Sequence, residues 1–194
     1  MGECRVADRE TDHRHPTRRN VLTFAGAAGL SLLSAPALAH FPAPRPAERK
    51  LSFHNLHTGE RLETTFWKRG SYRRSACLDI DHILRDWRTG DVKRIDRELF
   101  DLLHDLAQRV GSDAPFQVIS GYRSPETNAM LVKASNGGVA RKSYHLRGMA
   151  IDIALPDCGL KRLHTNAARL KRGGVGYYPN SGFVHVDTGP VRYW

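Results

Sequence analysis

Two segments of the sequence carry the strongest indications of fold and chemistry: SYHLRGMAIDIAL at residues 143–155 and FVHVD at residues 183–187. Side chains alternate across a β-strand, so Asp152 lies on the face opposite the isoleucines that flank it. In the second segment, His185 alternates in the same way with two valines. Two neighbouring strands would bring Asp152 and His185 together, and His145 precedes the first strand by a short turn.

Two imidazoles and one carboxylate form the ligand set of a catalytic zinc site, whose fourth position is left for water. The pattern therefore indicates a metal-dependent hydrolase. Each residue also has a plainer interpretation. A lone His is usually a hydrogen-bonded structural residue, and an Asp between apolar residues can be a buried carboxylate that accepts backbone hydrogen bonds. The metal hypothesis depends on the three residues acting together.

The N-terminal stretch indicates export. Arg18 and Arg19 precede a small and apolar run over residues 21–38, which ends in a small-x-small pattern at residues 37–39. This order is typical of a cleaved secretory signal, and the paired arginines indicate the twin-arginine route. We expect a signal peptide at residues 1–39 and a mature protein in the periplasm. An uncleaved membrane anchor is the alternative, because the apolar run is near the lower length limit of a membrane span.

The chain is strongly basic, with a formal net charge of +10. Residues 1–39 contain five arginines and four acidic residues, so their removal leaves a charge of +9. A basic surface suits anionic partners, and outside the cytoplasm these are cell-wall polymers or lipid headgroups rather than nucleic acid. The sequence contains no base-reading motif, so we expect no nucleic-acid partner. A solvated basic surface is the alternative interpretation.

The mature chain of about 155 residues suits a single domain with a sizeable core. Residues 40–50 are rich in Pro and Ala and are expected to form a linker, followed by the domain at residues 51–194. We expect a monomer without a transmembrane span once the signal is removed. Cys77 and Cys158 are the two cysteines of the mature chain, and the sequence leaves open whether they form a disulfide.

Hydrophobic patterning predicts an α+β domain, in which an N-terminal hairpin and helices pack on a small antiparallel sheet that carries the zinc site. Asp96 or a neighbour is expected to cap the second helix, and Gly111 to follow its end. The expected elements are a hairpin over 51–66, helices over 78–87 and 95–106, a strand over 116–120, a helix from Pro125, a helix over 160–170 and a strand region from Gly176.

Several sequence blocks resemble a known family. The blocks are LRDWR at 84–88, SGYRS at 120–124, S-x-H-x-x-G-x-A-x-D at 143–152, GGVGYY at 173–178 and GFVHVDTGP at 182–190. They resemble the exported peptidase M15-like family, also called DUF882 or YcbK-type, which includes MepK-like murein endopeptidases. This family is related to the D-Ala-D-Ala carboxypeptidases, the lysostaphin-type enzymes and the hedgehog fold. The resemblance extends over residues 51–194.

The resemblance implies roles for individual residues. It implies zinc bound by His145, Asp152 and His185. Arg123 would bind a substrate carboxylate or stabilise a developing oxyanion, because its guanidinium is permanently charged and has a fixed fork of donors. A structural ion pair near the strand end is the other interpretation of Arg123.

Three further residues are expected near the substrate. Tyr122 and Tyr178 would contact it, and Ser143 would orient a metal ligand through a hydrogen bond.

The usual general base of the better-known relatives is missing. Many of them carry a Glu three residues before the last zinc-binding His, or a His two residues before it, whereas this chain has Gly182 and Phe183. Asp187 is the candidate substitute, because it shares a strand face with His185 at a separation of about 7 Å. Alternatively, Asp187 bonds the turn that follows it. Weaker candidates for the base are Tyr177, Tyr178 and His164.

Taken with the export signal and the metal-binding pattern, the resemblance implies an exported zinc metallopeptidase that hydrolyses peptide cross-links of peptidoglycan. A D,D- or L,D-carboxypeptidase that trims stem peptides is the second hypothesis. A non-catalytic cell-wall-binding module that retains a structural zinc is the third, because the usual base is absent.

Overall fold

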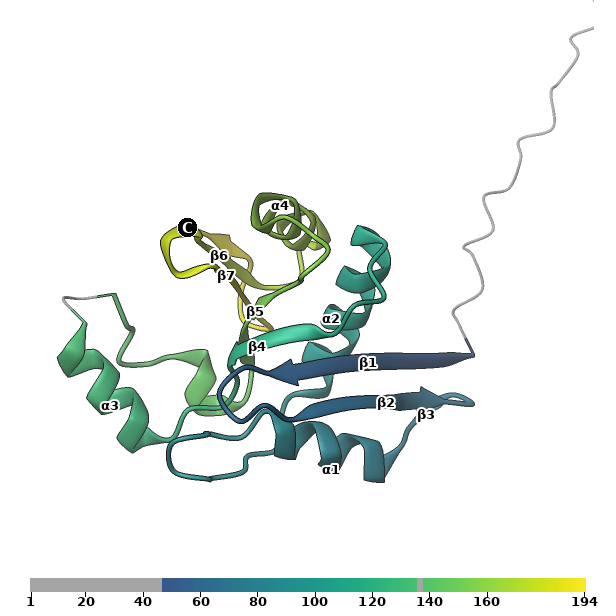
Figure 1. Cartoon of the computed structure of the whole chain (residues 1–194), viewed down its shortest axis with the longest axis horizontal. Helices are drawn as coiled ribbons and strands as arrows, with labels where there is room; N and C mark the ends of the chain where they lie inside the picture. Colours follow the sequence, from purple (N-terminus) through teal and green to yellow (C-terminus); the bar gives the residue numbers. More distant parts are fainter. Residues whose placement is uncertain (1–46, 136–137) are drawn as a thin grey trace, which may run out of the picture. The chain divides into compact units, whose positions relative to one another are not determined.

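The computed structural model of the chain describes residues 47–135 and 138–194 (Figure 1). The expected signal peptide at residues 1–39 lies outside the described residues, as does most of the expected linker. Strand β1 (Glu48–Asn55) begins within the segment that was expected to be linker. Within the described part of the chain, no helix combines the length and the apolar character needed to cross a membrane.

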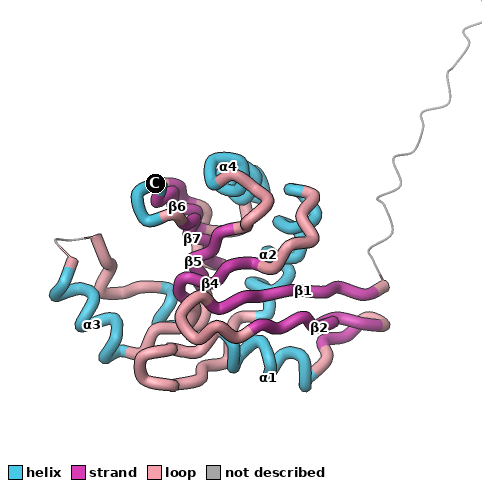
Figure 2. The backbone as a smooth tube through the Cα atoms, viewed as in Figure 1, coloured by secondary structure: helices cyan, strands magenta, loops and turns pink. Residues whose placement is uncertain are grey.

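The strands form one sheet of eight, in the order β3-β2-β1-β4-β5-β7-β6-β8. Figure 2 shows its central strands side by side in magenta. Neighbouring strands are antiparallel except for two parallel pairs, β1 with β4 and β6 with β8. The remaining strands are β2 (Arg61–Lys68), β3 (Ser71–Tyr72), β4 (Phe116–Ser120), β5 (Ala150–Ala154), β6 (Gly174–Tyr178), β7 (Phe183–Asp187) and β8 (Arg192–Tyr193).

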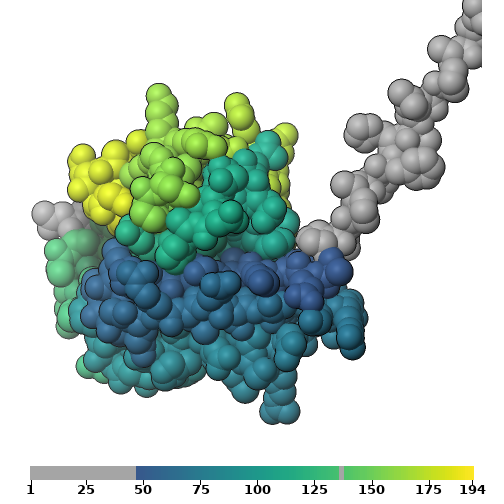
Figure 3. All heavy atoms as spheres, turned by 45° about the vertical axis from the view of Figure 1, so that its right-hand side comes forward, coloured from purple at the N-terminus to yellow at the C-terminus, as the bar shows by residue number. Residues whose placement is uncertain are grey.

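The α+β class is confirmed, but the sheet is larger than expected and mixed rather than antiparallel. The difference arises because the hairpin of β1 and β2 does not pack on the sheet as a separate layer. Instead β1 pairs directly with β4 and extends the sheet. In the space-filling view, the residues of the hairpin (blue) lie directly against later residues (teal and green), so the hairpin is an integral part of this domain (Figure 3).

The helices are α1 (Arg74–Ile83), α2 (Arg97–Val110), α3 (Pro125–Ala134) and α4 (Leu160–Leu170). The bounds of α4 match the prediction, and α2 is capped as expected: the Asp96 side chain accepts the N–H of Glu98, and Gly111 ends the helix in the left-handed conformation. The prediction that the first helix reaches Trp87 is wrong, because α1 ends at Ile83. Trp87 instead stacks on His57 in the following loop, with ring centroids 4.2 Å apart.

The hydrophobic core defines the two faces of strands β5 and β7. Ile151, Ile153 and the two valines of β7 are fully buried in this core, which also includes apolar residues of α2 and α4. Full burial of each such side chain contributes about 1.5–3 kcal/mol. Asp152 and His185 alternate with these residues and pair directly across the two antiparallel strands. The predicted alternation therefore places both polar side chains on the face opposite the core.

The loop after α1 holds the turn that follows β4. The Tyr122 N–H donates to the Leu84 carbonyl at 2.8 Å, and the Ser124 N–H donates to the Asp86 carboxylate at 2.8 Å. Gly121 lies so close to this loop that an added Cβ would collide with the Leu84 backbone. The turn carries Arg123, so the loop helps to fix the position of that side chain.

Replacing Asp86 with Ala is expected to lower the free energy of unfolding by about 1–3 kcal/mol, because backbone N–H groups of Ser124 and Arg88 lose their partner inside the protein. Burial opposes ionisation of Asp86, but hydrogen bonds from Thr127, Ser124 and Arg88 outweigh it and lower the pKa of the carboxyl. With its pKa lowered by folding, Asp86 stabilises the protein above its unfolded pKa, and this contribution is lost as pH falls through the folded value.

Urea unfolding at pH 7 and at progressively lower pH measures both effects. The difference between wild type and Asp86→Ala is expected to be largest near pH 7 and to shrink in acid. Asp79→Ala, at an exposed position on α1, is the control and is expected to change stability by no more than about 0.5 kcal/mol. Equal stability of wild type and Asp86→Ala at pH 7 would contradict the assignment.

Candidate metal centre

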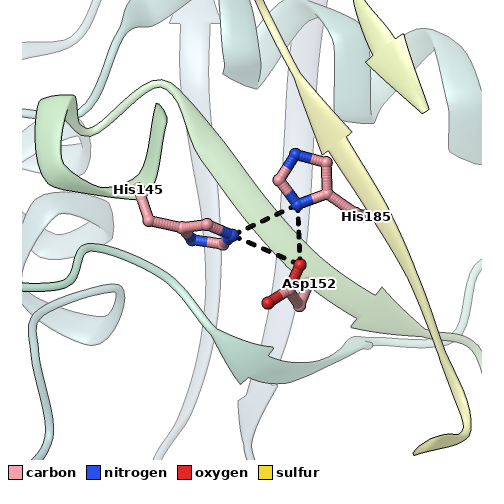
Figure 4. A group of neighbouring side chains, drawn as sticks. All are labelled: His145, Asp152 and His185. Carbon is pink, nitrogen blue, oxygen red and sulfur yellow. Dashed lines mark hydrogen bonds and ion pairs between the residues drawn. The ribbon is translucent and has the colours of Figure 1, made fainter. Parts of the chain in front are cut away.

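Side chains from three segments meet at one point of the structure (Figure 4). His145 comes from the 3-10 helix η1 (Tyr144–Arg147), Asp152 from β5 and His185 from β7. His145 Nε2 lies 3.2 Å from His185 Nδ1 and 3.3 Å from Asp152 Oδ1, and His185 Nδ1 lies 2.8 Å from Asp152 Oδ1. One ligand atom from each residue lies within 4.8 Å of the others, so the cluster could hold a metal ion.

The backbone of η1 fixes the position of His145. Ser143 caps η1, and its Oγ accepts the His145 N–H at 3.3 Å. Gly148 ends η1 with φ 66°, a backbone conformation that residues other than glycine rarely adopt. The His145 Nδ1 lies 2.7 Å from the Gly121 carbonyl oxygen, which can only accept, so Nδ1 carries the hydrogen. The lone pair of Nε2 is therefore free to face the other two residues, as metal binding requires.

A second carboxylate orients His185. The Nδ1 atom of His185 faces the cluster, while its Nε2 lies 3.0 Å from Asp187 Oδ2. Asp187 is fully buried and accepts N–H groups from Gly174 at 3.1 Å, Gly189 at 2.8 Å and Arg192 at 2.6 Å. Metal-binding histidines are commonly held in this way, through a carboxylate on the second ring nitrogen.

Burial and charge set the protonation of the cluster. Burial lowers the pKa of His145 despite the neighbouring Asp152, so a neutral ring is favoured. Burial opposes ionisation of Asp152, but the two histidines outweigh it and hold the pKa of its carboxyl well below the ordinary value. Burial also opposes protonation of His185, but hydrogen bonds to Asp152 and Asp187 raise its pKa. The cluster thus offers an ionised carboxylate and two imidazoles as ligands, a set that suits Zn²⁺, and metal binding would require His185 to release the proton on Nδ1.

Arg123 lies beside this cluster. Its Nη2 donates to Asp152 Oδ2 at 2.6 Å, and its Nε donates to Ser120 Oγ at 2.9 Å. The ion pair considered from the sequence is therefore present. The same guanidinium also lines the cavity above the cluster, so the ion pair and a contact with substrate are compatible.

A cavity of about 550 Å³ opens over the three residues, and we call it the catalytic cavity. Arg123, Ser143 and Tyr178, among the residues predicted from the sequence, line it. Tyr122 instead faces a different cavity. Tyr177 and His164 pack against each other, with ring centroids 5.0 Å apart.

Arg192 and Trp194 also line the cavity, and neither was expected there from the sequence. Trp194 lies with its ring centroid 5.3 Å from that of His185 and donates its indole N–H to Tyr178 Oη at 2.7 Å. Arg192 holds Asp187 and lies over the Tyr144 ring at 4.8 Å. No local pattern marks these residues, because they reach the site only through the pairing of β8 with β6.

An α+β domain with a buried His-Asp-His cluster, and with an arginine that lines the cavity over it, is the arrangement expected of a metallopeptidase. The sequence model of the Peptidase_M15_2 family, described as Peptidoglycan L,D-endopeptidase MepK, matches residues 43–194. The chain therefore belongs to this peptidase family, as its sequence blocks predicted.

Relatives in two organisms extend this comparison. The chain is 43% identical over 178 residues to Peptidoglycan L,D-endopeptidase MepK of Escherichia coli (strain K12), covering 91% of this chain and 96% of that protein. It is 41% identical over 179 residues to a protein of Haemophilus influenzae named "Probable peptidoglycan L,D-endopeptidase MepK", covering 91% of this chain and 95% of that protein. The similarity thus covers nearly the whole length of both relatives.

Proposed function

We propose that this chain is an exported, zinc-dependent endopeptidase that hydrolyses L,D peptide cross-links of peptidoglycan. The observation that carries the proposal is the buried cluster of His145, Asp152 and His185 beneath a cavity, in a chain 43% identical to a peptidoglycan L,D-endopeptidase. We further propose that the protein is exported by the twin-arginine route and cleaved after Ala39, so that the mass of the exported chain corresponds to a start near His40.

The three residues fit a zinc ion by their chemistry. Two imidazoles and a carboxylate are common zinc donors, and the hydrogen on His145 Nδ1 leaves Nε2 available. Zinc held there would supply a Lewis acid that polarises a carbonyl group and lowers the pKa of a water molecule to about 7. Ser143 supports this arrangement indirectly, by capping the segment that carries His145.

Arg123 and Tyr178 are the residues proposed to act on the substrate. Arg123 orients Asp152 and presents positive charge to the cavity, where negative charge develops on the oxygen of the attacked carbonyl. An indole N–H can only donate, so the Tyr178 oxygen accepts from Trp194. The phenolic hydrogen of Tyr178 is therefore free to donate to the substrate.

We propose that Asp187 positions His185 and is not the general base. Its two oxygens already receive hydrogen bonds from Gly174, Gly189 and Arg192, in addition to the contact with His185 Nε2. Complete burial also keeps the carboxylate away from the cavity. The bond from Gly189 is the turn interaction that the sequence offered as the alternative role.

Asp187→Asn distinguishes the two roles. A positioning role predicts that zinc affinity falls by about 10- to 100-fold and that excess zinc restores much of the activity. Zinc affinity is measured by competition with a chelator of known strength, and activity is measured over a zinc titration. A general base would behave differently: Asp187→Asn would bind zinc like the wild type and remain inactive at every zinc concentration, and that result would overturn the positioning role.

Product masses from a purified cross-linked muropeptide dimer test the proposed function. An L,D-endopeptidase is expected to convert the dimer into two monomers. A carboxypeptidase would release one terminal residue and leave the cross-link intact, and a binding module would leave the dimer unchanged with zinc present. Either of these two results would contradict the proposal.

A further inference from the structure

A second cavity also borders the segment that carries His145. It has a volume of about 530 Å³ and is lined by Lys93, helix α3, the turn before that helix and residues 141 and 146; we call it the α3 cavity. Residues 138–140 and 142–145 of the same segment line the catalytic cavity instead. Figure 1 shows α3 and this segment together at one end of the domain, in green. The two cavities therefore share one wall.

The α3 cavity has a strongly basic lining. Lys93, Lys133 and Arg141 contribute to it, and no acidic side chain does. The Nζ of Lys93 lies 5.8 Å from the centre of the Tyr122 ring. Within residues 47–135 and 138–194, none of the three cations forms a salt bridge. The lining thus presents positive charge that is available to an anionic ligand.

The remaining lining is mainly aliphatic. Pro125, Ala129, Val132 and Leu146 provide short apolar surfaces between the cations. A ligand that matches both features carries at least two carboxylates on a backbone with short aliphatic side chains. An acidic peptide has this chemistry, whereas a sugar chain without charge would leave the cations unused.

We propose that the α3 cavity binds the second stem peptide of a cross-linked substrate through its carboxylates. The inference rests on the proposed function and assigns a further part of the same substrate. Tyr122 of the α3 cavity adjoins Arg123 of the catalytic cavity, and Leu146 adjoins His145. Neighbouring Cα atoms are only about 3.8 Å apart, so the linings of the two cavities meet at these positions, and a branched peptide that extends past this boundary contacts both. A single linear stem engages one cavity, so the α3 cavity selects cross-linked peptides over monomers.

The double variant Lys133→Glu/Arg141→Glu tests the proposal. With a soluble, glycan-free cross-linked peptide dimer, its KM is expected to rise about tenfold or more, while kcat changes by less than about twofold. The wild-type KM is expected to rise with salt, and the variant KM to rise less steeply. Zinc content is expected to equal that of the wild type, because neither residue contacts the metal cluster.

Lys161→Glu/Arg169→Glu is the matched control, since it reverses the same number of charges at exposed positions of α4. Its KM is expected to remain at the wild-type value. An equal rise of KM in the control would mean that overall charge attracts the peptide. An unchanged KM in Lys133→Glu/Arg141→Glu would mean that the peptide does not use the α3 cavity. Either result overturns the proposal.

A binding measurement separates this proposal from the proposed function. Calorimetry with the same dimer is done with His145→Ala added to both proteins, so that neither hydrolyses the peptide, and is expected to give a Kd about tenfold higher when Lys133→Glu/Arg141→Glu is also present. If the His145→Ala protein binds the dimer in this way but wild type does not hydrolyse it, the endopeptidase function fails and the α3 cavity stands. If the two proteins bind the dimer equally, or if neither binds it, the α3 cavity proposal fails.

Discussion

Replacement of Asp152 by Asn is expected to remove most of the zinc and to lower kcat/KM for a cross-linked peptide by about a thousandfold or more. Asp152 is the one carboxylate of the cluster, and the amide preserves its size while removing its charge. The loss follows because two imidazoles alone provide no negative charge to a divalent cation. Metal content after dialysis and the hydrolysis rate, measured on the same preparation, give both quantities.

Folding is the control that this experiment needs. Asp152→Asn also leaves the Arg123 guanidinium without its buried partner, so urea unfolding must show that the variant is folded at the assay temperature. Asp157→Asn, at an exposed position just after the same strand, is expected to retain full zinc and full activity. A folded Asp152→Asn protein with wild-type zinc content and wild-type activity would exclude Asp152 as a ligand.

Replacement of Arg123 by Lys is expected to lower kcat by about 100- to 1000-fold while zinc remains bound. Arg123 holds Asp152 and Ser120 with separate nitrogens of one planar group and still faces the cavity. A lysine ammonium is a point charge on a flexible stem, and it cannot meet these partners together. Steady-state kinetics with the peptide dimer and metal analysis of the variant are the measurements.

The division of the loss between kcat and KM decides between the two expected roles of Arg123. A fall in kcat indicates stabilisation of negative charge in the transition state, whereas a rise in KM alone indicates a bond to a ground-state carboxylate. Arg172→Lys, in a more exposed ion pair with Asp105, is expected to leave both constants unchanged. Wild-type kcat and KM in Arg123→Lys would remove Arg123 from the reaction and leave only its ion pair.

The part of the site that could be predicted from the sequence depends on strand alternation. Asp152 and His185 each lie between aliphatic residues, so the core face and the site face follow from the sequence alone. Bringing these strands together needed only that they pair, and they do so in the register that sets Asp152 opposite His185. The strong apolar periodicity of α2 and α4 made those helices equally predictable.

The other parts of the site and of the sheet could not be predicted, because they depend on which distant strands pair. Nothing near residues 192–194 indicates that β8 lies beside β6, yet this pairing brings Trp194 against His185 and places its indole where an added Cβ at Gly176 would collide with it. The joining of the hairpin to β4 was hidden for the same reason. Sequence periodicity identifies the face of a strand but does not identify its neighbour.

The role of Asp187 shows a second limit. Its position on the same strand face as His185 is a correct inference, and the two side chains do meet. The sequence could not show which imidazole nitrogen it would contact, nor that three other residues would donate to its oxygens. These contacts depend on backbone and side-chain groups distant from Asp187, and they are the reason for proposing that Asp187 positions His185 instead of acting as a base.

A zinc titration on purified sacculi, with metal content measured on the same samples, shows whether hydrolysis depends on zinc bound to this protein. Protein stripped of metal is expected to release no shorter muropeptides. Release is expected to rise in proportion to bound zinc up to one ion per chain, and His145→Ala is expected to show neither stoichiometric zinc nor release. Release of muropeptides that is independent of bound zinc, or stoichiometric zinc binding without any release, would contradict the proposed zinc-dependent endopeptidase.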